Sequence, residues 1–165
     1  MIWVIAGINA LAVAVAPSIG LAQEYSGIAE VEKKNILSTN PILDIFAWFN
    51  VEYERKIGPT GTVGLAGSVI APNEEDIQYI SVFYRFYPQE RALSGFFVGG
   101  RIIVGNFEGN KGYGFGIDIA YSWLLGKNKG FSISLGIGAA RLFDEDLDES
   151  VTFPTLRLVN IGFAF

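Results

Sequence analysis

The stretch YGFGIDIAYSWLL, which runs from Tyr113 to Leu125, is the clearest indication of the fold in the sequence. Its odd-numbered positions are large and apolar, whereas its even-numbered positions are small or polar, with Leu124 as the exception. Side chains of a β-strand point alternately to opposite faces, and alternation that persists over ~10 residues is typical of a tilted transmembrane strand. The stretch therefore predicts a strand with one apolar face and one face of small and polar side chains.

Two further stretches alternate in the same way. Residues 131–140 follow the first stretch after the sequence GKNKG at 126–130, in which Gly and Asn tolerate the backbone angles of a tight turn. The chain ends on an alternating stretch at 155–165, in which four large side chains share one face: Val159, Ile161, Phe163 and Phe165. These stretches predict a hairpin and an aromatic last strand.

Five less regular stretches complete the predicted sheet. They lie at 33–38, 49–57, 62–70, 77–87 and 95–105. The connections at 58–61, 88–94 and 126–130 are short, whereas those at 39–48, 71–76, 106–112 and 144–153 are mostly longer or more polar. Alternating short turns and long loops are typical of membrane barrels. We therefore predict an all-β fold, an eight-stranded antiparallel up-and-down transmembrane β-barrel over residues 33–165.

The N-terminal stretch predicts export. The chain has 165 residues and a formal net charge of −5, a length that fits one domain plus a targeting segment. Residues 1–22 carry no charge and end on Gly-Leu-Ala, the small-x-small pattern of a cleavage site. We expect a signal peptide at 1–22 and a short N-terminal segment at 23–32. An uncleaved anchor helix is the alternative, because the basic start of a signal peptide is missing.

Composition argues against several functional classes. The chain has no histidine and no cysteine, so its serines lack the usual general base. A serine paired with Lys56 as the base is the remaining alternative for a nucleophile. We therefore expect no catalytic residues and no cofactor. The acidic balance without a cluster of Lys and Arg gives no reason to expect nucleic-acid binding.

Charged residues gather on the inward face of the predicted strands. They are Glu52, Glu54, Lys56, Arg85, Arg101 and Asp118. The side chains of an eight-stranded barrel fill its interior, so we interpret these residues as a structural charge network that plugs the lumen. A gated ion path and a catalytic pair of Glu52 and Glu54 are the alternatives.

Two acidic clusters fall in predicted loops, at 74–76 and 144–149. The second has carboxylates at the first, third and fifth positions of a calcium loop. Glu149 stands where that loop requires Gly, and Thr155 stands where it requires a bidentate Glu. We therefore expect a solvated acidic loop and no metal site, with weak binding of divalent cations as the alternative.

Aromatic residues cluster near the predicted strand ends, as in the girdles of membrane barrels. Toward the turns these are Tyr87, Tyr121, Trp123, Phe131 and Phe165, and toward the loops they are Trp48, Phe49, Phe107, Tyr113 and Phe153. Arg157 falls on the outward phase of the last strand, near the loops. There it would contact an anionic headgroup; a misassigned phase of the strand is the alternative.

Three motifs carry a resemblance to a known group: KNIL at 34–37, NVEYERKIG at 50–58 and NIGFAF at 160–165. In these the chain resembles the small eight-stranded outer-membrane proteins of the OmpA and OmpX type, and most nearly a bacterial barrel family known as a domain of unknown function. The resemblance implies a location in the outer membrane of a Gram-negative bacterium and no activity.

The expected role is structural or surface interaction by a monomer with a plugged lumen. The implied partners are outer-membrane lipid and lipopolysaccharide, periplasmic chaperones, and the barrel-assembly machinery, which would recognise the last strand through Val159, Ile161, Phe163 and Phe165. A small pore or carrier for solutes is the first alternative. A soluble lipocalin-like barrel is less favoured, because it would need an apolar interior and a polar exterior.

Overall fold

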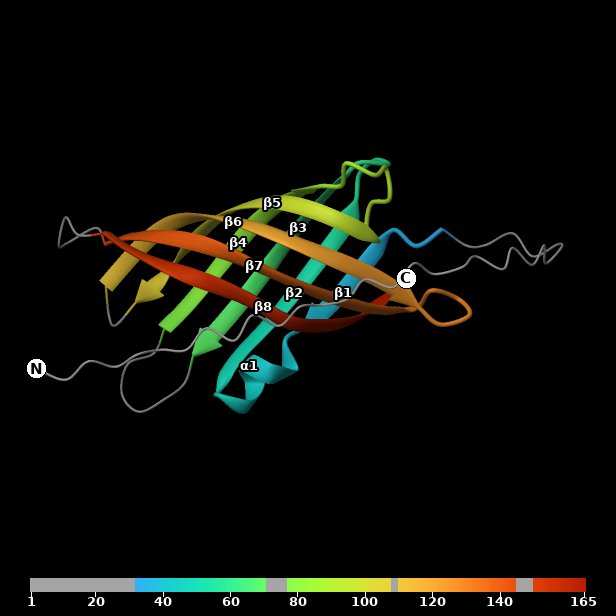
Figure 1. Cartoon of the computed structure of the whole chain (residues 1–165). Coiled ribbons are helices and arrows are strands. Elements are labelled where there is room, and N and C mark those ends of the chain that lie inside the picture. Colours follow the sequence, from blue (N-terminus) through green and yellow to red (C-terminus); the bar gives the residue numbers. More distant parts are fainter. Residues whose placement is uncertain (1–31, 71–76, 108–109, 145–149) are drawn as a thin grey trace, which may run out of the picture.

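The structure is a computed structural model, and it describes residues 32–70, 77–107, 110–144 and 150–165. The elements in chain order are β1 (Asn35–Thr39), α1 (Pro41–Ile45), β2 (Trp48–Lys56), β3 (Gly61–Ile70), β4 (Ile77–Phe86), β5 (Gly95–Phe107), β6 (Asn110–Leu125), β7 (Phe131–Asp144) and β8 (Ser150–Ala164). Each strand pairs antiparallel with its neighbours in the sequence, and β1 pairs with β8. The sheet is therefore a closed barrel (Figure 1), and the predicted all-β fold with eight strands in up-and-down order is confirmed.

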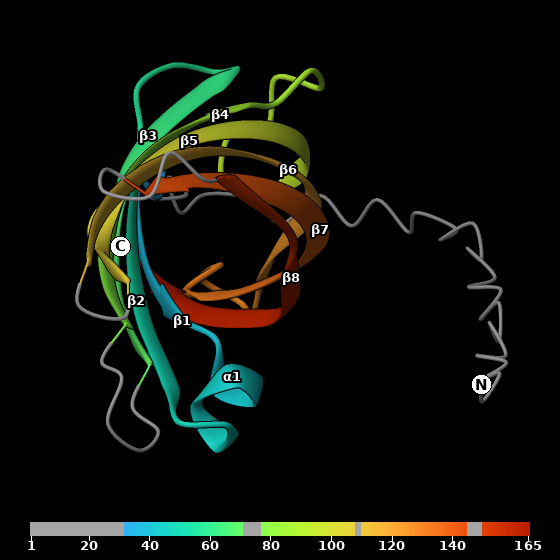
Figure 2. The same ribbon diagram turned by 90° about the vertical axis from the view of Figure 1, so that its left-hand side faces the viewer.

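Alternating side chains give the barrel an apolar outside and a polar inside. In β6, Ile117 is 60% exposed on the outer face, whereas its neighbour Asp118 is 5% exposed on the inner face. The same pattern in β4 places Ile80 and Val82 outside and Ser81 inside. Figure 2 shows the strands curving around the interior that these inward side chains occupy.

The two ends of the barrel differ. The connections 57–60, 87–94 and 126–130 lie with the C-terminus at one end, which we call the turn end (Figure 1). The helix α1 lies at the opposite end, which we call the loop end. This helix occupies a connection that we predicted as a loop. The Asn40 side chain accepts a hydrogen bond from the Leu43 backbone N–H, and Pro41 fills the first helical position, so the sequence starts a helix there.

Several strand boundaries differ from the prediction. β1 begins at Asn35 rather than at residue 33 and ends at Thr39. β6, β7 and β8 each extend three to five residues further toward the loop end than predicted. Cross-strand pairs such as Gly112 with Asp144 continue there, although these residues lack the apolar alternation of a predicted strand. Backbone pairing with a neighbour, rather than apolar alternation, sets these boundaries.

A β-bulge interrupts β8. Ser134 pairs with Asn160, whereas Gly136 pairs with Arg157, so β8 holds one extra residue between these two pairs. The extra residue reverses the phase of the strand. Phe163 and Phe165 face outward after the bulge, whereas Thr155 before it reaches an inward carboxylate. The outward phase predicted for Arg157 assumed uninterrupted alternation, from which the pairing of β8 departs, and the Arg157 side chain itself lies outside the described part of the structure.

Two aromatic residues assigned to the girdles lie inside the barrel instead. Tyr87 is fully buried, and the Trp48 indole N–H donates to Ser68 Oγ at 2.6 Å. Both residues share the inward phase of their strands, which their position near a strand end does not reveal. Six of the other girdle residues are exposed on the outside: Phe49, Tyr113, Tyr121, Trp123, Phe131 and Phe165.

Some predictions fall on residues outside the described ranges. These are the signal peptide at 1–22, most of the segment at 23–32, the acidic cluster at 74–76 and most of the acidic stretch at 144–149. No helix within the described ranges is long and apolar enough to span a membrane.

Candidate functional site

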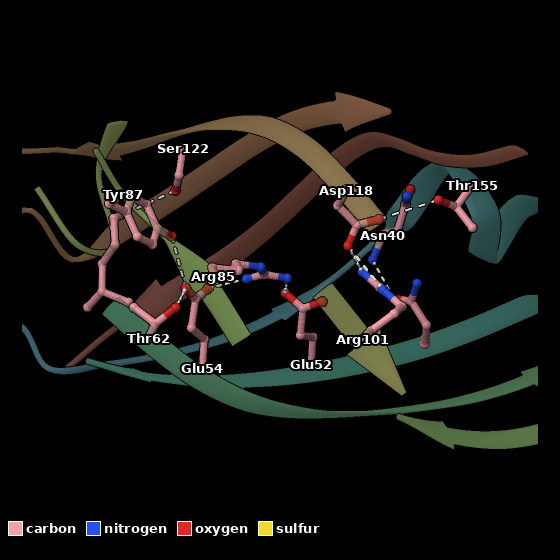
Figure 3. Close-up of polar contacts among 12 residues, drawn as sticks. Asn40, Glu52, Glu54, Thr62, Arg85, Tyr87, Arg101, Asp118, Ser122 and Thr155 are labelled. Atoms are coloured by element: carbon pink, nitrogen blue, oxygen red, sulfur yellow. Dashed lines mark hydrogen bonds and ion pairs between the residues drawn. The ribbon is translucent and has the colours of Figure 1, made fainter. Parts of the chain in front are cut away.

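Arg85 lies inside the lumen, in the half toward the turn end. Its side chain extends from β4 and is 2% exposed. Nη2 donates to Glu52 Oε1 at 2.7 Å, and Nη1 donates to Glu54 Oε2. Both glutamates lie on β2 two residues apart, so both point inward. Arg85 is therefore held between two carboxylates, as Figure 3 shows.

Aromatic rings and hydroxyl groups complete the surroundings of this arginine. The guanidinium carbon lies 4.1 Å from the centre of the Phe83 ring and 4.8 Å from that of the Phe97 ring, within the range of cation–π attraction. Glu54 Oε1 also accepts hydrogen bonds from Thr62 Oγ1 at 2.6 Å and from the Tyr87 hydroxyl at 2.9 Å. We call Glu52, Glu54, Thr62, Arg85 and Tyr87 the Arg85 cluster. Sequence reasoning missed Thr62 and Tyr87, although the inward phase of their strands would have identified them.

A second ion pair lies closer to the loop end. Arg101 on β5 donates from Nε to Asp118 Oδ2 on β6 at 3.0 Å, and its Nη2 donates to the same oxygen. Thr155 Oγ1 on β8 donates to the other oxygen, Oδ1, at 3.4 Å. Three strands therefore meet at one carboxylate, beside α1 (Figure 3).

Lys56 does not join these lumen charges. It lies at the turn end of β2, where Nζ donates to Glu32 Oε1 at 2.6 Å. The ammonium group lowers the pKa of the exposed Glu32 carboxyl below its ordinary value, through this hydrogen bond and through charge attraction. The structure thus brings together Glu52, Glu54 and Arg85 in one group and Arg101 and Asp118 in another, and leaves Lys56 outside both.

Glycines on the inner face make room for the large inward side chains. A Cβ atom at Gly64 would overlap the ring of Phe83, and one at Gly99 would lie 3.2 Å from Arg85 Cγ. The narrow lumen therefore pairs small residues on one strand with large residues on the next.

The connection between β4 and β5 closes the turn end. Leu93 is fully buried and packs against Ile36, Ala164 and Leu124. Its backbone oxygen accepts a hydrogen bond from Ser122 Oγ at 3.0 Å. Its φ of 74° lies in the left-handed region that side chains rarely adopt. The packing around Leu93 thus stabilises a strained turn over the end of the lumen.

The other half of the lumen contains a cavity of about 140 Å³, which we call the loop-end cavity. Its walls include Glu52, Arg101 and Asp118, together with Asn160 from β8. Leu43 of α1 and the aromatic side chains Trp48 and Tyr79 also line it. The Arg85 cluster and Leu93 separate this cavity from the turn end, so it is a blind pocket.

The described part of the chain offers little for metal or covalent chemistry. It contains no group of three or more His, Cys, Asp or Glu side chains that could hold a metal ion. Lys56, the lysine considered as a base for a serine nucleophile, is paired with Glu32 at the turn end. The buried Ser81 hydroxyl has no hydrogen-bond partner among the described residues, so nothing activates it there.

Comparison of the chain with protein-family models, with curated proteins and with solved structures finds no match. A function can therefore be inferred only from the geometry of the barrel and its lumen.

Proposed function

We propose that this chain is an integral outer-membrane barrel with a closed lumen and a structural or surface-interaction role. One observation carries the proposal: the outer face of the sheet is apolar across its middle, while the ion-paired side chains of Glu52, Glu54, Arg85, Arg101 and Asp118 lie inside. Ile102 near the middle of β5 is 66% exposed, and Ile80, Ile117 and Ile137 are similarly exposed on neighbouring strands. Monomeric proteins in water rarely expose so continuous an apolar surface, whereas lipid chains would cover it.

The exposed aromatic residues support the same location. Trp123, Phe131, Phe163 and Phe165 lie on the outside near the turn end, and Phe49 and Tyr113 lie on the outside near the loop end. Such residues favour the two interfaces of a membrane. The outward phase of Phe163 and Phe165 also suits recognition of the last strand by the barrel-assembly machinery. Val159 and Ile161, the other members of that predicted signal, are half-buried.

The filled lumen supports a structural or surface role over transport. A solute that crossed the barrel would have to displace the Arg85 cluster, the ring of Phe97 and the buried Leu93. The polar interior also disfavours a soluble barrel that carries apolar ligands. Contacts with other molecules would then be made from the two ends of the barrel.

A pair of arginine substitutions tests the location in lipid. Ile102→Arg places a charge near the middle of the apolar outer face, and Ile57→Arg places one just beyond β2 at the turn end, where the side chain is 58% exposed. A charge costs ~2–4 kcal/mol at the bilayer midplane and ~0–1 kcal/mol near an interface. Urea unfolding in phosphatidylcholine vesicles should therefore show a large loss for Ile102→Arg and a small loss for Ile57→Arg. Equal, small losses would contradict the proposal, because exposed surface positions in water tolerate charge.

A further inference from the structure

The loop-end cavity is lined by buried polar side chains. Asn160 is 5% exposed and lines the cavity, and a side-chain amide can both donate and accept hydrogen bonds. Arg101, which binds Asp118 through Nε and Nη2, lines the same cavity. The cavity is therefore equipped to bind a polar molecule.

The charges around the cavity indicate a neutral molecule. The two wall carboxylates already accept hydrogen bonds from arginines, Glu52 from Arg85 and Asp118 from Arg101. An anion would meet these two carboxylates, and a cation would meet the guanidinium of Arg101. A hydroxyl group both donates and accepts, so it can bind the Asn160 amide, the Arg101 N–H groups and a carboxylate oxygen together.

Aromatic side chains form another part of the cavity lining. Trp48 and Tyr79 line it, and the hydrogen bond from the indole N–H to Ser68 Oγ fixes the Trp48 ring. Asn50 Oδ1 accepts a hydrogen bond from the Asn40 backbone N–H at 3.0 Å. This bond connects the residue before α1 to the first residues of β2, next to Trp48. The pocket thus combines a rigid apolar surface with convergent polar groups, as small-molecule sites do.

We propose that the loop-end cavity binds one neutral pyranose, the terminal sugar ring of a glycan. A pyranose carries hydroxyl groups around its edge and C–H groups on its faces. The hydroxyl groups match Asn160, Arg101 and the carboxylates, and the C–H face matches Trp48. About 140 Å³ is less than the ~300 Å³ of a drug-sized site, which suits a single ring. This inference goes beyond the proposed function and does not depend on the membrane location.

Titration of methyl pyranosides tests this inference. The folded protein is prepared in a phosphocholine detergent, which has no sugar headgroup, and the emission of Trp48 is followed. We expect a saturable change for at least one of the gluco, galacto and manno forms, with a Kd of order 1 mM. Trp123→Phe should preserve this change, because Trp123 lies on the outside of the barrel.

Two cavity variants and one matched control make the test specific. Asn160→Ala should weaken binding about tenfold, since a lost hydrogen bond of this kind is worth about that factor. Ser68→Ala, which frees the Trp48 indole, provides a second variant if Asn160→Ala does not fold. Ser132→Ala removes a buried inward hydroxyl that does not line the cavity, and it should bind normally. The inference is overturned if no pyranoside binds, if Asn160→Ala and Ser68→Ala bind as tightly as the unmodified protein, or if ethanolamine or phosphate binds there instead.

Discussion

Arg85→Met removes the guanidinium that binds Glu52 and Glu54 while keeping an unbranched side chain in the lumen. Arg85 and both glutamates are almost fully buried. Removing one partner of a buried ion pair costs ~3–5 kcal/mol, because the remaining charge is left without compensation. With a urea slope of ~2 kcal/mol per M, a loss of ~4 kcal/mol lowers the unfolding midpoint by ~2 M.

Two controls separate this cost from a general effect of losing an arginine. Arg91→Met changes an exposed arginine in the turn between β4 and β5, and the free energy of unfolding should change by no more than ~0.5 kcal/mol. Adding Glu52→Gln and Glu54→Gln to Arg85→Met should recover most of the loss, because the buried charges are then removed together. If Arg85→Met unfolds at the midpoint of the unmodified protein, or if the triple variant is no more stable than Arg85→Met, then Arg85 does not compensate the charges of the two buried glutamates.

The remaining predictions concern the closed lumen and its packing. In planar bilayers the unmodified protein and Arg101→Ala should show no conductance steps, because the Arg85 cluster and Leu93 still close the lumen. The triple variant Arg85→Ala, Leu93→Ala, Phe97→Ala removes that closure and should conduct. Steps from the unmodified protein would favour the pore alternative. Gly64→Ala should lose ~1–3 kcal/mol in urea unfolding because the new methyl group meets the Phe83 ring, and Gly100→Ala, which points into open space, should change stability little. Equal effects of the two glycine substitutions would contradict the proposed packing.

Alternation predicted the strands because it shows which face of each strand is apolar. The pattern at 113–125 identified β6 almost completely, and the phase of β2, β4, β5 and β6 placed five of the six predicted charges inside the barrel. The same phase also identifies Tyr87 as inward, since it lies two residues after Arg85. Tyr87 was wrongly assigned to a girdle because it lies near a strand end.

Other features depend on contacts between distant parts of the chain. The bulge between Ser134 and Gly136 results from how β7 pairs with β8, and alternation within β8 alone does not show it. Lys56 shares the inward phase of Glu54, yet it reaches past the end of the barrel to Glu32. α1 is different, because Asn40 followed by Pro41 is a local signal for the start of a helix. That signal was available in the sequence.

The most direct test of the central claim is membrane fractionation followed by gel mobility before and after boiling. We expect the protein in the outer-membrane fraction, where lipid covers the apolar outer face of the closed sheet. The unboiled protein should run at a different position from the boiled protein, because a closed barrel stays folded in cold detergent. Recovery in the aqueous fraction, or identical mobility before and after boiling, would contradict the claim that this chain is a membrane barrel.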